Sequence, residues 1–155
     1  MILLICDHKK RELQSLRKLQ QDLILKNIKS KIVNKHNVIR AYNFYKPQAV
    51  TFPHTRKHFA KIIDQLYGKT ILISIPSEHC ALNENFINVH YQGKHKNYYL
   101  KSSHKKIDYV FVQGRKIEKY LIKNNIYPKR KIIVSGHLNY DFWFNKNIKK
   151  SKRNN

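Results

Sequence analysis

Short apolar runs alternate with one-sided amphipathic segments along most of this chain, and this alternation constrains the fold more than any other feature. The apolar runs lie at residues 2–6, 31–33, 49–52, 71–75, 109–112 and 132–134. The β-branched run at 71–75 predicts a strand buried on both faces. Between the runs, residues 13–24, 59–66 and 117–123 place apolar side chains at three- and four-residue steps, which is typical of helices with one buried face. The sequence therefore predicts an α/β fold: a Rossmann-like, three-layer parallel sheet with helices on both faces.

Capping residues and helix breakers mark several expected element ends. Asn37 is expected to cap a short helix that ends before Pro47, because a residue before proline avoids the helical conformation. Thr55 is expected to cap the next helix, with Gly68 at its C-terminal end. Residues 83–105 show weak periodicity and predict a long loop with a helical piece.

Length and cysteine content favour one intracellular domain. The 155 residues predict a Rossmann-like domain over 1–144, followed by a basic, disordered tail over 145–155. Two distant cysteines are too few for a disulfide scaffold and fit a reducing compartment. The N-terminus lacks the pattern of a secretory signal, and no apolar run is long enough to cross a bilayer. We expect a cytoplasmic protein, with peripheral contact at the inner face of the membrane as a further option.

A formal net charge of +23 indicates either an anionic partner or a biased codon composition. Nucleic acid and anionic membrane surfaces are the partners that such a charge attracts. However, lysine greatly outnumbers arginine and is spread along the whole chain, and asparagine, isoleucine and tyrosine are also abundant, as in AT-rich genomes. Proteins that read base sequence rely on arginine. We favour codon composition with modest surface attraction, and a basic nucleic-acid-binding module remains the alternative.

Polar clusters follow two of the predicted strands. Ser77, Glu78 and His79 follow the run at 71–75, and Asp7 and His8 follow the first run. Open α/β sheets bind ligands beyond the carboxyl ends of their strands, at the point where the strand order reverses. If the first and fourth strands flank that switch point, the two clusters share one crevice.

Glu78 is the candidate general base, because a carboxyl group beside a hydrophobic sheet can have a raised pKa and take a proton from an acceptor hydroxyl. Ser77, His79, Asp7 and His8 are candidates for binding the substrate. The alternatives are structural: Ser77 and Glu78 would only start a helix, whose dipole favours a carboxylate, and Asp7 and His8 would form a solvated turn.

His54, Arg56 and Lys57 follow the third strand and are candidates for binding an anionic group of the acceptor, the alternative being a solvated loop and helix start. A zinc set of two cysteines and two histidines is conceivable, but no metal-binding spacing supports it, and scattered cysteines are usually inert core thiols. It would comprise Cys6, His8, His79 and Cys80. No metal site is predicted. The chain also lacks GxGxxG and GxxxxGK[ST] loops, so no cofactor is expected in this domain.

Five segments in order resemble bacterial surface carbohydrate biosynthesis proteins of the two-domain GT-B glycosyltransferase-like class, near the Kdo transferases and CDP-glycerol glycerophosphotransferases. The segments read I-L-L-I-C-D-H-K-K-R-E-L-Q-S-L, K-P-Q-A-V-T-F-P-H, I-S-I-P-S-E-H, Y-V-F-V-Q-G and K-I-I-V-S-G-H-L-N-Y-D-F. The last segment is similar to the I-x-V-T-G-x-x-R-x-D ending of that class. Two positions depart from the family pattern: His79 stands where glycine is usual, and Asn139 where arginine is usual.

The resemblance implies the N-terminal, acceptor-binding half of a glycosyltransferase in surface polysaccharide assembly, such as lipopolysaccharide or capsule. The acceptor would be a carbohydrate or lipid-linked molecule, Glu78 the base, and the sugar nucleotide would bind a second domain or partner chain. We therefore expect part of an enzyme, with this chain by itself inactive. An inactive remnant is a further alternative.

Overall fold

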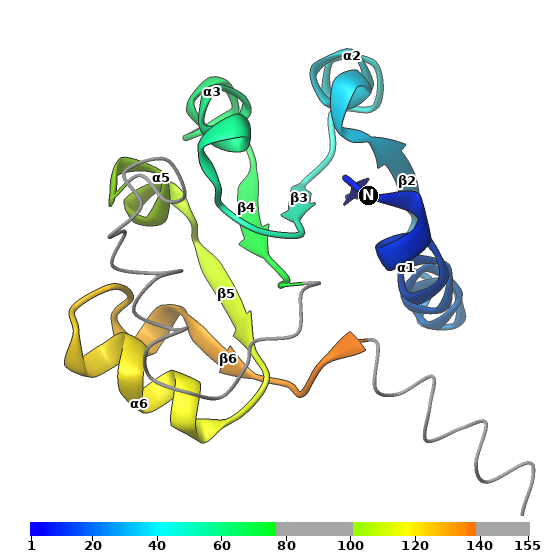
Figure 1. The fold of residues 1–155 in the computed structure, drawn as a ribbon. Helices are drawn as coiled ribbons and strands as arrows, with labels where there is room; N and C mark the ends of the chain where they lie inside the picture. The colour runs from blue at the N-terminus through cyan, green and yellow to red at the C-terminus, as the bar shows by residue number, and fades with distance from the viewer. Residues whose placement is uncertain (77–100, 139–155) are drawn as a thin grey trace, which may run out of the picture.

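The computed structural model describes residues 1–76 and 101–138 and contains one all-parallel, six-stranded sheet in the order β2-β1-β3-β4-β5-β6. Figure 1 shows the arrangement of the strands and of the helices around them. The strands are β1 (Ile2–Cys6), β2 (Ser30–Asn34), β3 (Ala49–Phe52), β4 (Ile71–Ser74), β5 (Tyr109–Val112) and β6 (Ile132–Val134). The predicted Rossmann-like α/β class is confirmed, and each described strand lies at a run that the sequence marks.

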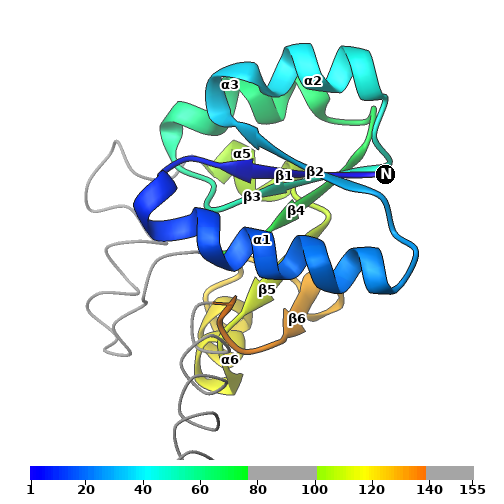
Figure 2. The ribbon, with the colours of Figure 1, turned by 90° about the vertical axis from the view of Figure 1, so that its right-hand side faces the viewer.

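Helices cover both faces of the sheet, as predicted. They are α1 (Lys9–Leu25), α2 (Val38–Tyr45), α3 (Lys57–Leu66), α5 (Lys101–Lys106) and α6 (Arg115–Lys123), with 3₁₀ turns η1 (Lys35–Asn37) and η2 (Lys129–Lys131). Helix α1 packs on one face through Leu16 against Leu4 and Cys6, whereas α2, α3 and α6 pack on the other. Figure 2 shows α1 on the side of the sheet opposite α2 and α3. No helix in the described ranges is long and apolar enough to cross a membrane.

The main core lies between the sheet and α2, α3 and α6. Alternate strand residues point into it, because side chains along a strand alternate between faces. Burial of each large apolar side chain there stabilises the fold by about 1.5–3 kcal/mol. Its fully buried members include Leu3, Ile5, Val50, Phe52, Phe59, Ile63, Leu72, Ile117 and Leu121.

Strand β4 is buried on one face only, so the predicted burial on both faces is wrong. Leu72 and Ser74 are buried, whereas Ile71 is 44% exposed and Ile73 is intermediate. The neighbouring strand repeats the pattern, with Tyr109 42% exposed. In the described part of the chain, α1 is the helix on this face, and its apolar contacts are with β1 and β2.

Element ends follow the sequence in part. Helix α2 ends before Pro47, and Gly68 follows the end of α3 with φ +73°, a conformation that glycine adopts without strain. Asn37 makes no side-chain cap bond; instead Asn34 Oδ1 accepts the His36 backbone N–H at 3.0 Å and starts η1. Helix α5 covers the last residues of the predicted segment 83–105 and ends one residue beyond it. Residues 83–100 of that segment and the predicted tail at 145–155 lie outside the described residues.

Candidate functional site

The switch point of the sheet lies between β1 and β3. Strand β2 pairs with one side of β1, and β3 pairs with the other side. Leu4 of β1 is therefore in register with both Ile32 of β2 and Thr51 of β3. The expectation that the first and fourth strands flank the switch point is therefore wrong, because β3 occupies the edge of β1 that β4 would have needed. Asp7, at the end of β1, consequently faces the segment after β3.

Glu12 holds the turn that carries Asp7. Its carboxylate is buried, with the residue 2% exposed, and Oε2 accepts the backbone N–H groups of Asp7 at 2.7 Å and His8 at 3.1 Å. These groups lie at the start of α1, where backbone donors lack partners within the helix. Glu12 therefore acts as a cap from inside the first turns of α1 and fixes the backbone of Asp7.

Replacing Glu12 with alanine should lower the free energy of unfolding by about 2 kcal/mol, because two partly buried N–H groups lose their acceptor. Urea denaturation followed by far-UV circular dichroism measures the loss. Glu12→Gln retains an acceptor oxygen and should cost less. Equal losses for the two variants would show that the carboxylate charge, rather than the two hydrogen bonds, is what matters.

The Asp7 carboxylate is the centre of a cluster of side chains from three segments. Lys35 Nζ lies 2.6 Å from Oδ1, and the Nε2 atoms of His54 and His58 each lie 3.2 Å from Oδ2. Burial by itself would raise the pKa of Asp7, but the hydrogen bond and charge of Lys35, with the two histidines, outweigh it and lower the pKa to about 2. Asp7 is therefore ionised at physiological pH.

His54 is a buried, neutral member of the cluster. Its side chain is 5% exposed, and burial, with the charges of Arg56 and His58, lowers its pKa to about 3 despite the nearby Asp7 carboxylate. Its Nδ1 accepts the Arg56 backbone N–H at 3.5 Å, so Nε2 carries the proton and donates to Asp7. The contact between His54 and Asp7 is thus a hydrogen bond to a carboxylate rather than an ion pair.

His58 presents the exposed side of the cluster. Its side chain is 44% exposed, and its ring packs against His54 with centroids 4.8 Å apart and against Phe59 at 4.7 Å. These contacts place one ring nitrogen on Asp7 and leave the other side of the ring accessible. Sequence reasoning missed His58, although it stands four residues after His54.

The structure brings together two of the predicted site residues, Asp7 and His54. Arg56 lies beside them as the residue before α3, whereas His8 is exposed and its ring makes no hydrogen bond to the described residues. Cys6 is buried in the α1 core and its pKa is raised, chiefly by burial, as expected of a structural thiol. The other predicted residues lie outside the described ranges: Ser77, Glu78, His79 and Cys80.

Thr55 turns into the protein instead of capping α3, so that prediction is wrong. The residue before α3 is Arg56, which makes no side-chain cap bond. Thr55 is 3% exposed, and its Oγ1 lies 3.3 Å from Nδ1 of the buried His104, which also lies 2.7 Å from the Tyr127 hydroxyl. A buried hydroxyl needs a polar partner, and His104 supplies it. This buried polar network begins at Thr55, the residue that follows His54 in the chain.

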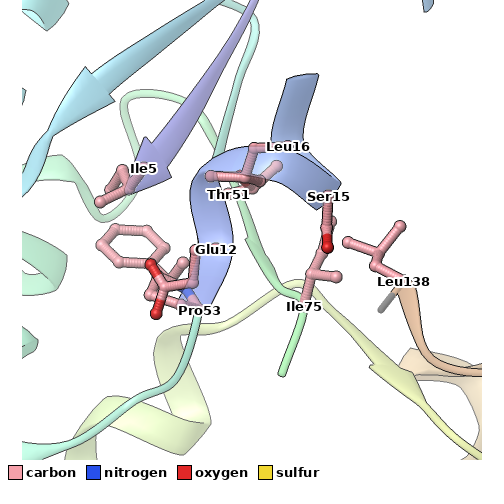
Figure 3. A pocket seen from close by; sticks show the side chains of 9 residues that line it. Ile5, Glu12, Ser15, Leu16, Thr51, Pro53, Ile75 and Leu138 are labelled. Atoms are coloured by element: carbon pink, nitrogen blue, oxygen red, sulfur yellow. The ribbon is translucent and has the colours of Figure 1, made fainter. Parts of the chain in front are cut away.

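A small apolar cavity lies at the same edge of the sheet, on the α1 side (Figure 3). Its volume is about 20 Å³, enough for roughly one water molecule and far below the few hundred Å³ of a small-molecule pocket. This cavity is therefore too small to hold a sugar or another small-molecule ligand. The cavity is lined by Ile5, Glu12, Ser15, Leu16, Thr51, Phe52, Pro53, Ile75 and Leu138.

Three ligand atoms of the cluster are close enough together to hold one metal ion. Asp7, His54 and His58 each offer one atom, and these atoms lie within 4.8 Å of one another. Comparisons of the chain with family models, with curated proteins and with solved structures find no match. Fold and site together define a Rossmann-like α/β domain with a carboxylate–imidazole cluster at its switch point.

Proposed function

We propose that this chain is the acceptor-binding half of a GT-B-like glycosyltransferase of surface polysaccharide assembly. The observation that carries the proposal is the position of Asp7, His54 and His58 at the β1/β3 switch point, where open α/β sheets bind their ligands. A carboxylate and imidazole rings offer both acceptors and donors, which a hydroxyl-rich acceptor requires.

The members of the cluster have different roles in this proposal. His54 is buried and engaged through both ring nitrogens, so it positions Asp7 and does not contact the acceptor. His58 donates Nε2–H to Asp7 and leaves Nδ1 to accept a hydrogen bond from an acceptor hydroxyl. Lys35 keeps Asp7 ionised and is the second contact that fixes its carboxylate.

The chemical step follows from the resemblance. The acceptor oxygen forms a bond to the anomeric carbon, the bond from that carbon to the nucleotide phosphate breaks, and the nucleotide leaves with the electron pair. Glu78 is the proposed acceptor of the hydroxyl proton. A second domain or partner chain would hold the sugar nucleotide.

Binding of soluble sugars to the metal-free chain tests the acceptor site. We expect Kdo or another member of a mono- and disaccharide panel to shift the nuclear magnetic resonance signals of His58. Asp7→Asn should weaken that binding about ten-fold, the effect of losing one charged hydrogen-bond partner. Asp22→Asn is the matched control, because Asp22 is an exposed carboxylate on α1 that pairs with Lys18 away from the cluster.

Three outcomes would contradict the proposal. The first is a sugar that binds wild-type protein and Asp7→Asn equally well. The second is sugar transfer from a nucleotide donor at ordinary enzyme rates by this chain without a second domain. The third is tight binding of nucleic acid that persists at physiological salt with no sugar binding, which would favour the nucleic-acid-binding alternative.

A further inference from the structure

We propose that Asp7, His54 and His58 form a binding site for one divalent transition-metal ion of the Zn²⁺ type. Each of the three residues offers one ligand atom, and these atoms lie within 4.8 Å of one another. The shortest approaches are those of the two histidine Nε2 atoms to Asp7 Oδ2, each at 3.2 Å. The proposal goes beyond the proposed function, because metal binding requires no acceptor and no second domain.

Two of the three separations between the ligand atoms suit a tetrahedral ion. Bonds of about 2.0–2.1 Å at tetrahedral angles separate two ligand atoms by about 3.3 Å. Asp7 Oδ2 lies 3.2 Å from each histidine Nε2, so two of the three ligand separations already match. The ion would enter between groups that now share hydrogen bonds to a single oxygen.

Asp7 is held by contacts that would survive binding. The backbone N–H of Asp7 donates to the buried Glu12, and Lys35 holds the other carboxylate oxygen of Asp7, Oδ1, at 2.6 Å. Such outer contacts orient the ligands in metal sites. His58 is the second residue of α3, so a helix sets its direction, and its half-exposed ring leaves the fourth position of the ion open toward solvent.

Two imidazoles and one carboxylate select the class of ion. Imidazole suits Zn²⁺, Co²⁺ and Ni²⁺, whereas Mg²⁺ and Ca²⁺ prefer oxygen ligands. An ion on Nε2 requires the proton of each neutral ring to stand on Nδ1. For His54 this exchange sets two donors, Nδ1–H and the Arg56 backbone N–H, against each other at 3.5 Å, so the ring turns away from the longest hydrogen bond in the cluster when the ion binds.

Metal titration of the full, untagged chain tests the site. After removal of metals with a chelator, Zn²⁺ is titrated calorimetrically, and Co²⁺ is titrated by visible absorption, which reports tetrahedral coordination. We expect one equivalent to bind. His58→Ala, a change at an exposed position, should weaken binding by at least about 100-fold, since it removes a ligand rather than an outer contact.

Matched controls separate this site from the other histidines and cysteines of the chain. His8→Ala and His36→Ala remove exposed histidines near the cluster, and Cys80→Ser tests the cysteine-containing set that the sequence suggests; all three should bind as wild type does. If Zn²⁺ does not bind wild type, or if His58→Ala binds one equivalent unchanged, the proposal is wrong. Sugar binding is measured on metal-free protein, so the two proposals fail separately. A chain that binds no sugar can still bind Zn²⁺, and a chain that binds no Zn²⁺ can still bind sugar.

Discussion

Replacing Phe59 with alanine lowers the free energy of unfolding by about 3–5 kcal/mol, the range for truncating a buried phenylalanine. Phe59 is fully buried, with 0% exposure, and its ring meets Phe52 edge-on with centroids 5.6 Å apart. It also packs against His54 at 5.0 Å and His58 at 4.7 Å. The loss combines apolar transfer, an unfilled cavity and the aromatic contacts. Urea denaturation followed by far-UV circular dichroism measures it.

Phe44→Ala is the matched control, because it makes the same change at a side chain that is 78% exposed on α2. The Phe44 ring meets Tyr45 edge-on at 4.7 Å, a contact at the surface, and its loss should cost less than about 1 kcal/mol. Phe59→Leu should lie between the two, since it retains most of the apolar volume. Similar losses for Phe59→Ala and Phe44→Ala would contradict the assignment of Phe59 to the core.

The elements could be predicted from the sequence because the signals for them are local. The apolar run at residues 2–6 and the three- and four-residue spacing from Leu13 to Ile24 need no knowledge of neighbouring segments. Strand order is different, because the same alternation of strands and helices fits more than one order around β1. From the sequence we expected Asp7 to lie beside the segment after β4. Because β3 is the neighbour of β1, Asp7 instead contacts His54 in the segment after β3.

Three further residues have contacts that were not predicted from the sequence. Lys35 is one of 32 lysines and arginines, and only its pairing with Asp7 distinguishes it from the rest. Glu12 lies in a helix of ordinary composition, where its burial depends on the turn folding back over it. Thr55 has the composition of a cap, but the buried partner that it meets, His104, is 49 residues away. The contacts of Lys35 and Thr55 join segments that are far apart in the sequence, and such contacts cannot be read from local pattern.

His104 makes the folded protein less stable as the pH falls from 6.5 to 4. Burial lowers its pKa from 6.5 to about 4, so over this range the unfolded chain binds a proton that the folded chain does not. The free energy of unfolding therefore rises with pH in this window, by at most about 1.4 kcal/mol per pH unit and about 3 kcal/mol in total. Above pH 6.5 and below pH 4 this residue contributes no further slope.

A variant isolates the effect of His104 from the other groups that titrate. His104→Asn retains a polar atom near the Nδ1 position, next to the Tyr127 hydroxyl and Thr55, and cannot take up a proton. Asp7 and His54 titrate in both proteins, so their contributions cancel in the difference. Urea denaturation at pH 7, 6, 5 and 4 should show the stability advantage of wild type over the variant shrinking by about 3 kcal/mol. If the free energies of unfolding of the two proteins change with pH in parallel, His104 is protonated in the folded state as it is in the unfolded chain, which would contradict the prediction. A charged imidazole could persist there only if the network around Tyr127 opened to water.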